Sequence, residues 1–137
     1  MLSFFAKGKP KAQPRVKAAR RGSFMHIYTP DSADEWKTTV KAACVKAWDG
    51  RQILGPVKVD IQVYFERPKK HYTKKGLRDN APNWHCSKPD RDNCDKAILD
   101  ALTDLGVMKD DSQACAGGVT KQYAVAETGA QITITEL

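Results

Sequence analysis

Seven aspartates lie between residues 89 and 113 of this 137-residue chain, which is otherwise strongly basic. The same window holds three basic residues, so its net charge is −4, whereas the whole chain carries +7. A protein that only coats a polyanion has no use for carboxylates gathered in one place. A hard divalent cation such as Mg²⁺ binds carboxylate oxygens together with phosphate oxygens and water. The pattern therefore favours a site that cleaves phosphodiesters.

Four residues of this window are the candidate catalytic group: Asp90, Asp92, Lys96 and Asp111. Phosphodiester hydrolysis needs an activated water, charge neutralisation on the phosphate and stabilisation of the leaving alkoxide, and one or two Mg²⁺ ions can supply all three. Asp90 and Asp92 precede a predicted helix and can turn towards one point, and Asp111 could join them from a neighbouring turn. These three aspartates are the candidate metal ligands. Lys96 would contact the scissile phosphate or steady the carboxylates.

Each of these residues also has a purely structural explanation. Asp90 or Asp92 could cap the helix, because carboxylates are favoured beside the free backbone amides of a helix N-terminus. Lys96 could form i,i+4 pairs with Asp92 and Asp100. The segment 110–112 could be an ordinary polar turn without chemistry.

Two other metal sites fit the sequence less well. A calcium loop of the EF-hand type is excluded, because Asp95 stands where that loop needs glycine and Ala101 where it needs glutamate. A zinc site could in principle form from His85, Cys86, Cys94 and Cys115. The spacing is loose and contains no Cys-x-x-Cys pair, so free thiols are favoured over a zinc site.

Length and composition predict one domain over residues 1–137 with a single hydrophobic core. No apolar run is long enough to span a membrane, and the basic N-terminus lacks a signal-peptide core, so we expect a cytosolic protein. The sequence pI near 9.3 favours a polyanionic partner. Nucleic acid is favoured over an anionic membrane surface, because no basic amphipathic helix is evident.

Two basic segments are candidates for DNA contact. The first, about residues 7–22, holds no acid and contains Pro10 and Pro14, so we predict a mobile loop that either solubilises the protein or grips phosphates. The second, about residues 66–88, is a long connection of basic and aromatic residues that suits either base stacking or a flexible solvated insert. The candidate DNA-binding residues are Arg15, Lys17, Arg20, Arg21, Lys69, Lys70, Lys74 and Lys75.

The strands that would position the site are predicted from alternation and turn residues. Residues 2–6 and 23–29 are expected to form short strands, and residues 57–65 alternate as a half-buried antiparallel strand does. Residues 119–126 and 130–135 are predicted to pair with each other as a hairpin.

The predicted helices have clear end signals. The first is expected from about residue 33 to 48, started by a capping box of Ser32 and Glu35, with both tryptophans on its buried stripe. The second covers residues 92–105 and is ended by Gly106. Together these elements predict an α+β fold with two helices packed on a mixed, mainly antiparallel sheet of four to five strands.

The most specific pattern in the chain consists of Pro89-Asp90-Arg91-Asp92-Asn93, Lys96, Asp100-Ala101-Leu102 and Lys109-Asp110-Asp111-Ser112-Gln113. It resembles the signature of the RusA family of Holliday-junction resolvases, in which Pro-Asp-x-Asp-Asn is followed by a helical lysine, Asp-Ala-Leu and an Asp-Asp pair. Further likeness, from Lys7-Gly8-Lys9-Pro10 to the terminal Ile-Thr-Ile-Thr-Glu, extends the resemblance over nearly the whole chain.

The resemblance implies a RusA-like fold in which Asp90, Asp92 and Asp111 bind the metal and Lys96 is the catalytic lysine, with Asp110 a weaker candidate. It implies a homodimer that uses Mg²⁺ or Mn²⁺ to place symmetric nicks in two strands of a four-way DNA junction. Family members are common in phages and prophages, so action in the cytoplasm of a bacterial host is implied.

The chain departs from the family pattern at Arg91, at Cys94-Asp95 and at 114–118, where small residues replace a β-branched strand. These departures bear on the dimer contact and on substrate preference rather than on the reaction type. Two alternative functions stay open: an architectural protein that binds junctions without cutting them, and a broader nuclease for flaps or branched DNA in phage replication.

Overall fold

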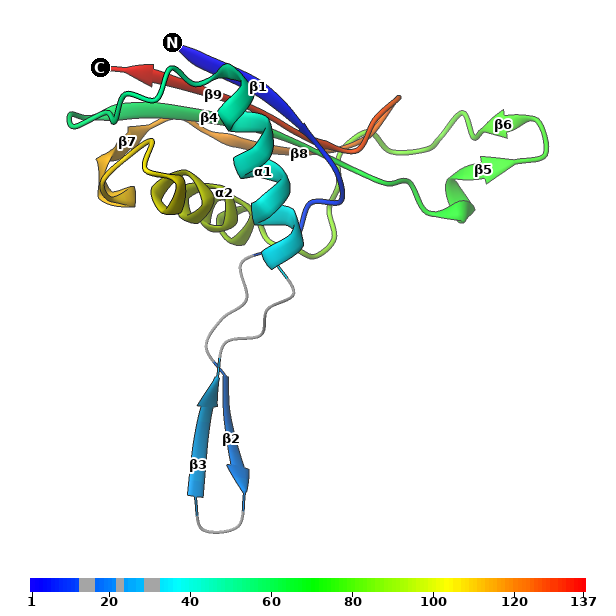
Figure 1. Ribbon diagram of the computed structural model, residues 1–137. Coiled ribbons are helices and arrows are strands. Elements are labelled where there is room, and N and C mark those ends of the chain that lie inside the picture. The colour runs from blue at the N-terminus through cyan, green and yellow to red at the C-terminus, as the bar shows by residue number, and fades with distance from the viewer. Residues whose placement is uncertain (13–16, 22–23, 29–32) are drawn as a thin grey trace.

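The computed structural model shows a curved sheet with two helices on one face (Figure 1). It describes residues 1–12, 17–21, 24–28 and 33–137. The strands are β1 (Leu2–Lys7), β2 (Lys17–Arg21), β3 (Phe24–Tyr28), β4 (Val57–Phe65), β5 (Tyr72–Thr73), β6 (Gly76–Leu77), β7 (Ala114–Ala116), β8 (Val119–Tyr123) and β9 (Gly129–Glu136). The helices are α1 (Asp34–Ala47) and α2 (Arg91–Leu105), with short 3-10 helices η1 (Lys69–His71) and η2 (Asp111–Gln113).

Strand β4 lies at the centre of the five-stranded sheet. On one side β9 pairs with it antiparallel, and β1 continues the sheet antiparallel beyond β9. On the other side β7 and β8 both run parallel to β4. The predicted α+β class and the mixed sheet are therefore confirmed.

The predicted hairpin of residues 119–126 with 130–135 is wrong. Strands β8 and β9 follow each other in the sequence, but β4 lies between them. Their connection passes round the end of β4, where the Ala124 amide donates to the Phe65 carbonyl at 2.8 Å. The physical reason lies in β4, which is nine residues long and buries every second side chain. Such a strand is best placed where both of its edges are paired, and β8 and β9 supply the two partners.

The basic segment also differs from the prediction. A mobile loop was predicted over about residues 7–22, but Lys17–Arg21 form strand β2, which pairs antiparallel with β3. Both prolines of the segment precede Lys17, so they do not interrupt this pairing. The apolar and aromatic residues of β3 have high strand propensity and give β2 its partner.

Helix α1 places its buried side chains on the sheet. Trp36, Val40 and Cys44 recur every four residues and are at most 2% exposed, so Trp36 belongs to the core as predicted. Trp48 is only partly buried, and its indole Nε1 donates to the Arg51 carbonyl at 3.0 Å. The predicted N-cap, Ser32, lies outside the described residues; the helix starts after Ala33, which makes no side-chain cap bond.

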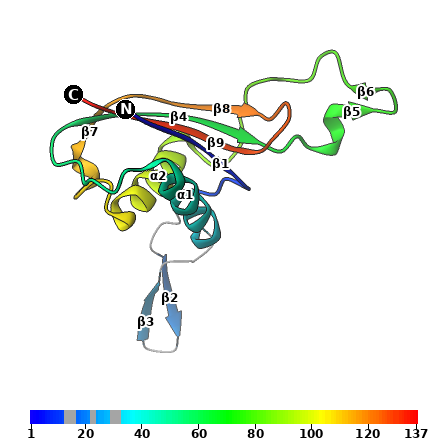
Figure 2. The ribbon, with the colours of Figure 1, turned by 45° about the horizontal axis from the view of Figure 1, so that its top comes forward.

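Helix α2 lies beside α1 on the same face of the sheet (Figure 2). Its buried residues are Cys94, Ala97, Ile98, Leu99, Ala101 and Leu102. The helix ends at Gly106, which has a φ of 95° and donates its amide to the Leu102 and Thr103 carbonyls. Val107 and Met108 are fully buried directly after it. Burial of these two side chains fixes the start of the segment that carries Asp111.

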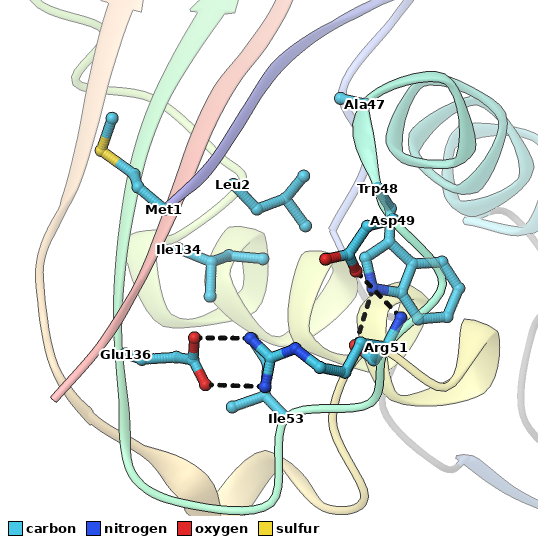
Figure 3. A pocket seen from close by; sticks show the side chains of 9 residues that line it. All are labelled: Met1, Leu2, Ala47, Trp48, Asp49, Arg51, Ile53, Ile134 and Glu136. Atoms are coloured by element: carbon cyan, nitrogen blue, oxygen red, sulfur yellow. Dashed lines mark hydrogen bonds and ion pairs between the residues drawn. The ribbon is translucent and has the colours of Figure 1, made fainter.

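The two chain ends lie near each other beside the end of α1. Arg51 donates two hydrogen bonds to the Glu136 carboxylate, at 3.2 and 2.7 Å, beside a cavity of about 110 Å³ (Figure 3). Leu2, Ile53 and Ile134 line this cavity. The bidentate pair closes the last strand onto the α1–β4 connection, so we interpret this region as structural.

Within the described part of the chain, no helix has both the length and the apolar character needed to cross a membrane.

Candidate active site

Asp90 occupies the N-cap position of α2 with an extended backbone, φ −69° and ψ 154°. Its carbonyl accepts the first helical hydrogen bond, from the Cys94 amide at 3.1 Å, but its carboxylate makes no capping bond. The carboxylate instead accepts a hydrogen bond from Lys88 Nζ at 3.2 Å. Capping by the side chain therefore does not explain Asp90.

Asp92 lies in the first turn of α2 and is exposed. Its carboxylate has no hydrogen bond or ion pair to any residue that the structure describes. Lys96, also among the described residues, pairs with Asp100 and Asp111 and not with Asp92. Asp92 is thus a surface carboxylate near the helix N-terminus, where the helix dipole favours its charge.

Lys96 joins two segments of the site. Its ammonium donates to Asp100 at 2.7 Å, the expected i,i+4 pair, and to Asp111 at 2.9 Å. These hydrogen bonds, first to Asp100 and then to Asp111, raise the pKa of Lys96 well above its usual range. Lys96 is therefore a permanent cation that connects α2 to η2, across 15 residues of sequence.

Residues 110–113, Asp-Asp-Ser-Gln, form the turn next to α2, and their side chains have different roles. Asp110 accepts a hydrogen bond from Ser112 Oγ at 2.6 Å, and this bond is the main cause that lowers the pKa of Asp110. Gln113 accepts from the Asp110 amide at 3.0 Å and donates to the Ile53 carbonyl at 2.8 Å. Asp110 and Gln113 thus build the turn, and Asp111 is left to face α2.

Asp95 is a further carboxylate of this site that sequence reasoning did not select. Its pKa is raised, mainly by burial and then by the negative charges of Asp111 and Asp92. Asp111 and Asp92 therefore lie close enough to Asp95 to disfavour its charge. The only sequence signal for Asp95 as a site residue is that it is acidic and stands where the chain departs from the family pattern.

The small residues at 114–118 have a steric explanation. Asp95 and Cys115 line a hollow of about 180 Å³ between α2 and this segment. Gly117 has a φ of 111°, and a Cβ there would lie 2.0 Å from the Val59 carbonyl oxygen. Only glycine allows the chain to pass this close to β4. The Gly118 amide then donates to Asp60 Oδ1 at 3.2 Å.

The donor set of the candidate site fits a hard cation. Carboxylate oxygens are the ligands that Mg²⁺ prefers, and after burial the negative charges of Asp111 and Asp92 raise the pKa of Asp95, an effect that a divalent ion would offset. As they stand, however, no three His, Cys, Asp or Glu residues of the described ranges gather closely enough to hold an ion. The Asp90 carboxylate accepts a hydrogen bond from Lys88, and the Asp111 carboxylate accepts one from Lys96. Side-chain rearrangement would have to accompany metal binding.

The alternative zinc site does not form among the described residues. Burial raises the pKa of Cys94 to about 11, so this thiol stays protonated at neutral pH. His85 instead stacks on Phe65, with ring centroids 3.9 Å apart. Cys86 and Cys115 are exposed and free.

Comparison with known proteins places the chain in a family. The family model described as "Endodeoxyribonuclease RusA" matches residues 7–135. The chain belongs to the RusA endodeoxyribonuclease family. It is also 32% identical over 126 residues to "Uncharacterized protein YqaN" of Bacillus subtilis (strain 168), a match that covers 90% of this chain and 88% of that protein. The RusA match includes the carboxylate segment and the connection between β4 and α2.

The candidate DNA-binding residues of this RusA chain fall in two places. Lys69, Lys70, Lys74 and Lys75 are exposed on the connection between β4 and α2, which is folded and carries η1, β5 and β6. Lys17, Arg20 and Arg21 lie in β2, of which the structure describes the backbone course. Arg15 lies outside the described residues.

Proposed function

We propose that this RusA-family protein is a Mg²⁺-dependent endodeoxyribonuclease that resolves four-way DNA junctions by paired symmetric nicks. The observation that carries the proposal is the ammonium of Lys96, held at 2.7 and 2.9 Å between Asp100 and Asp111. It joins the helix that carries Asp90 and Asp92 to the turn that carries Asp111. Membership in an endodeoxyribonuclease family supports the reaction class.

In this proposal Asp90, Asp92 and Asp111 would hold the metal, with Mn²⁺ as an alternative to Mg²⁺. The bound ion supplies an activated water and neutralises phosphate charge. Lys96 acts as a cation, because its raised pKa makes it unsuited to accept a proton near neutral pH. It would contact a non-bridging phosphate oxygen, and release of its bond to Asp111 would free that carboxylate for the metal.

The remaining parts of the proposal concern assembly and substrate contacts. We propose one nuclease domain over residues 1–137 that forms a homodimer, since a two-fold substrate presents two equivalent strands to two equivalent sites. A phage or prophage origin and action in the bacterial cytoplasm belong to the same proposal. The proposed phosphate contacts are Arg15, Lys17, Arg20, Arg21, Lys69, Lys70, Lys74 and Lys75.

A cleavage assay tests the proposal. A labelled synthetic four-way junction is incubated with the protein and Mg²⁺, beside linear duplex and Y-fork DNA. We expect paired symmetric nicks in the junction, which disappear with EDTA and in the Asp92→Asn variant. Asp104→Asn is the matched control, because Asp104 also lies on α2 but pairs with Lys41 at 3.5 Å, whereas Lys96 pairs with Asp100 and Asp111.

Two results would replace the proposal by its alternatives. Tight junction binding without any metal-dependent nick would indicate an architectural protein. Equal cutting of the four-way junction and the Y-fork would indicate a broader nuclease for branched DNA.

A further inference from the structure

The connection between β4 and α2 projects from the body of the protein beyond the ends of β4 and β8 (Figures 1 and 2). Its tip is the small hairpin of β5 and β6, in which Tyr72 pairs with Leu77 and Thr73 with Gly76. Directly opposite residues of an antiparallel pair point to the same face. Tyr72 and Leu77 therefore form an apolar pair at the tip, and they are 48% and 50% exposed.

The chemistry around this pair is strongly basic. Residues 69–78 include five basic residues and no acidic residue. An exposed apolar pair within such a field suits a partner with a negative exterior and an apolar interior. Duplex DNA at a branch has both properties, because its phosphates face outward and its bases can unstack at the crossover.

The tip is held in shape by its own hydrogen bonds. Thr73 Oγ1 donates to the Gly76 carbonyl at 3.2 Å and accepts from the Lys75 amide at 3.2 Å. Gly76 has a φ of 115°, which allows the tight turn. Arg78 then ties the hairpin to η1, since its Nε donates to the Lys70 carbonyl at 2.8 Å. A preorganised tip loses little conformational entropy when it binds.

The base of the projection is anchored to the sheet. Arg67 donates to the Pro82 carbonyl at 2.7 Å and lies over the Tyr123 ring, 5.4 Å from its centroid. His71 is 6% exposed and meets the same Tyr123 ring edge-on at 4.7 Å. Two residues of the projection therefore hold the last residue of β8, so the tip is not a freely moving loop.

The returning chain connects the tip to the candidate active site along the edge of β8. Tyr123 donates its amide to the Asn83 carbonyl at 2.8 Å, and His85 donates its amide to the Lys121 carbonyl at 3.0 Å. Lys121 Nζ donates to the Ser87 carbonyl at 2.7 Å. Three residues later the chain reaches Asp90. The tip and Asp90 thus belong to one anchored segment.

We infer that the Tyr72–Leu77 pair is a wedge that enters the base stack at the branch point of DNA, while the surrounding lysines bind the adjacent phosphates. This inference rests on the proposed function and deepens it, because it assigns branch selectivity to the tip. Apolar side chains that insert between base steps unstack them and bend the duplex. A branch point offers such steps at lower cost than a continuous duplex, so the wedge would favour junctions over linear DNA.

The test measures unstacking without cleavage. A four-way junction carries 2-aminopurine beside the crossover, and its fluorescence is followed as protein is added in EDTA. Fluorescence should rise with the unaltered protein and should not rise with the Tyr72→Ala/Leu77→Ala variant at saturating protein. The same variant should cut the junction in Mg²⁺ about tenfold or more slowly. A junction with unpaired bases at the crossover should restore most of the lost rate, because its bases are already unstacked.

Two control variants separate the wedge from general effects. Val125→Ala alters a side chain that is 98% exposed on another connection, and it should leave fluorescence and cleavage unchanged. Lys74→Ala/Lys75→Ala should weaken binding and reduce the salt dependence by about two phosphate contacts, yet keep the fluorescence rise at saturation. Thermal unfolding of each variant checks that the fold is retained.

The outcomes distinguish the wedge from the proposed function. If the Tyr72→Ala/Leu77→Ala variant unstacks the junction as the unaltered protein does, the wedge is excluded even when cleavage occurs. If unstacking depends on this pair but no nick appears in Mg²⁺, the wedge stands and the nuclease proposal fails. If the protein binds linear duplex as tightly as the junction, the assignment of branch selectivity to the tip fails, and the cleavage assay decides the nuclease proposal separately.

Discussion

Lys96→Met separates the catalytic from the structural explanation of the Lys96 bridge. The ammonium makes two ion pairs, to Asp100 and Asp111, and all three side chains are partly exposed, at 50%, 22% and 36%. Ion pairs with this exposure contribute about 0.2–1 kcal/mol each. Methionine keeps the length of the side chain and a similar helix propensity. The free energy of unfolding should therefore fall by no more than about 1–2 kcal/mol.

The effect on cleavage should be much larger. Removal of a cation that stabilises charge developing on a phosphate costs a factor of about 10²–10³ in rate. The variant should therefore retain at most about 1% of the junction cleavage rate at saturating Mg²⁺. Urea unfolding and single-turnover cleavage of the same preparation measure the two quantities.

The matched control is Lys41→Met, which removes another lysine–aspartate pair, between Lys41 on α1 and Asp104 on α2, at 3.5 Å. It should change stability by a similar small amount and leave cleavage intact. The reasoning is refuted if Lys96→Met cuts at a rate near that of the unaltered protein. It is also refuted if the loss of activity is matched by unfolding of the variant, because the bridge would then be structural.

Three further predictions concern the frame of the site. Gly117→Ala should destabilise the fold by about 2–3 kcal/mol or more in urea unfolding, since a Cβ at φ 111° would collide with the Val59 carbonyl; an unchanged midpoint would contradict this close approach. Burial is the main cause that lowers the pKa of both His71 and His85 in the folded protein. As the pH falls, the two imidazoles are therefore protonated in the unfolded chain before they are protonated in the folded protein. Stability should then be full above about pH 6.5 and decline as the pH falls below it, and a flat profile between pH 7.5 and 5.5 would refute this. Asp95→Asn should raise the urea midpoint at pH 7 in EDTA, because burial and nearby carboxylates raise the pKa of Asp95 and disfavour its charge; the gain should vanish below about pH 4, where the unfolded chain's aspartates are protonated.

The helices and the central strand could be predicted because their signals are local. The apolar spacing of α2 and the Gly106 stop lie within the segment itself, and the alternation of β4 is visible in nine consecutive residues. The order of strands was not accessible in this way. Whether β8 pairs with β9 or with β4 depends on which edge of β4 is free. The sequence of β8 contains no signal for this choice of partner.

The site shows the same division between local and distant contacts. The i,i+4 pair of Lys96 with Asp100 follows from helix geometry, whereas the bond from Lys96 to Asp111 depends on how the chain returns through the buried Val107 and Met108. Asp95 could not be selected by spacing, because its environment is set by a hollow between α2 and residues 114–119. The strand at Lys17–Arg21 was missed because its partner is outside the basic segment.

The chain that returns from the projection also has a consequence for the solubility of the protein. An exposed strand edge offers unpaired amides and carbonyls to other chains and so invites aggregation. Residues 83–87 cover part of the outer edge of β8, with the Tyr123 amide and the Lys121 carbonyl both paired to them. A shortened relative could therefore lose the β5–β6 hairpin, but it would need to keep this covering segment, or replace it, to remain monodisperse.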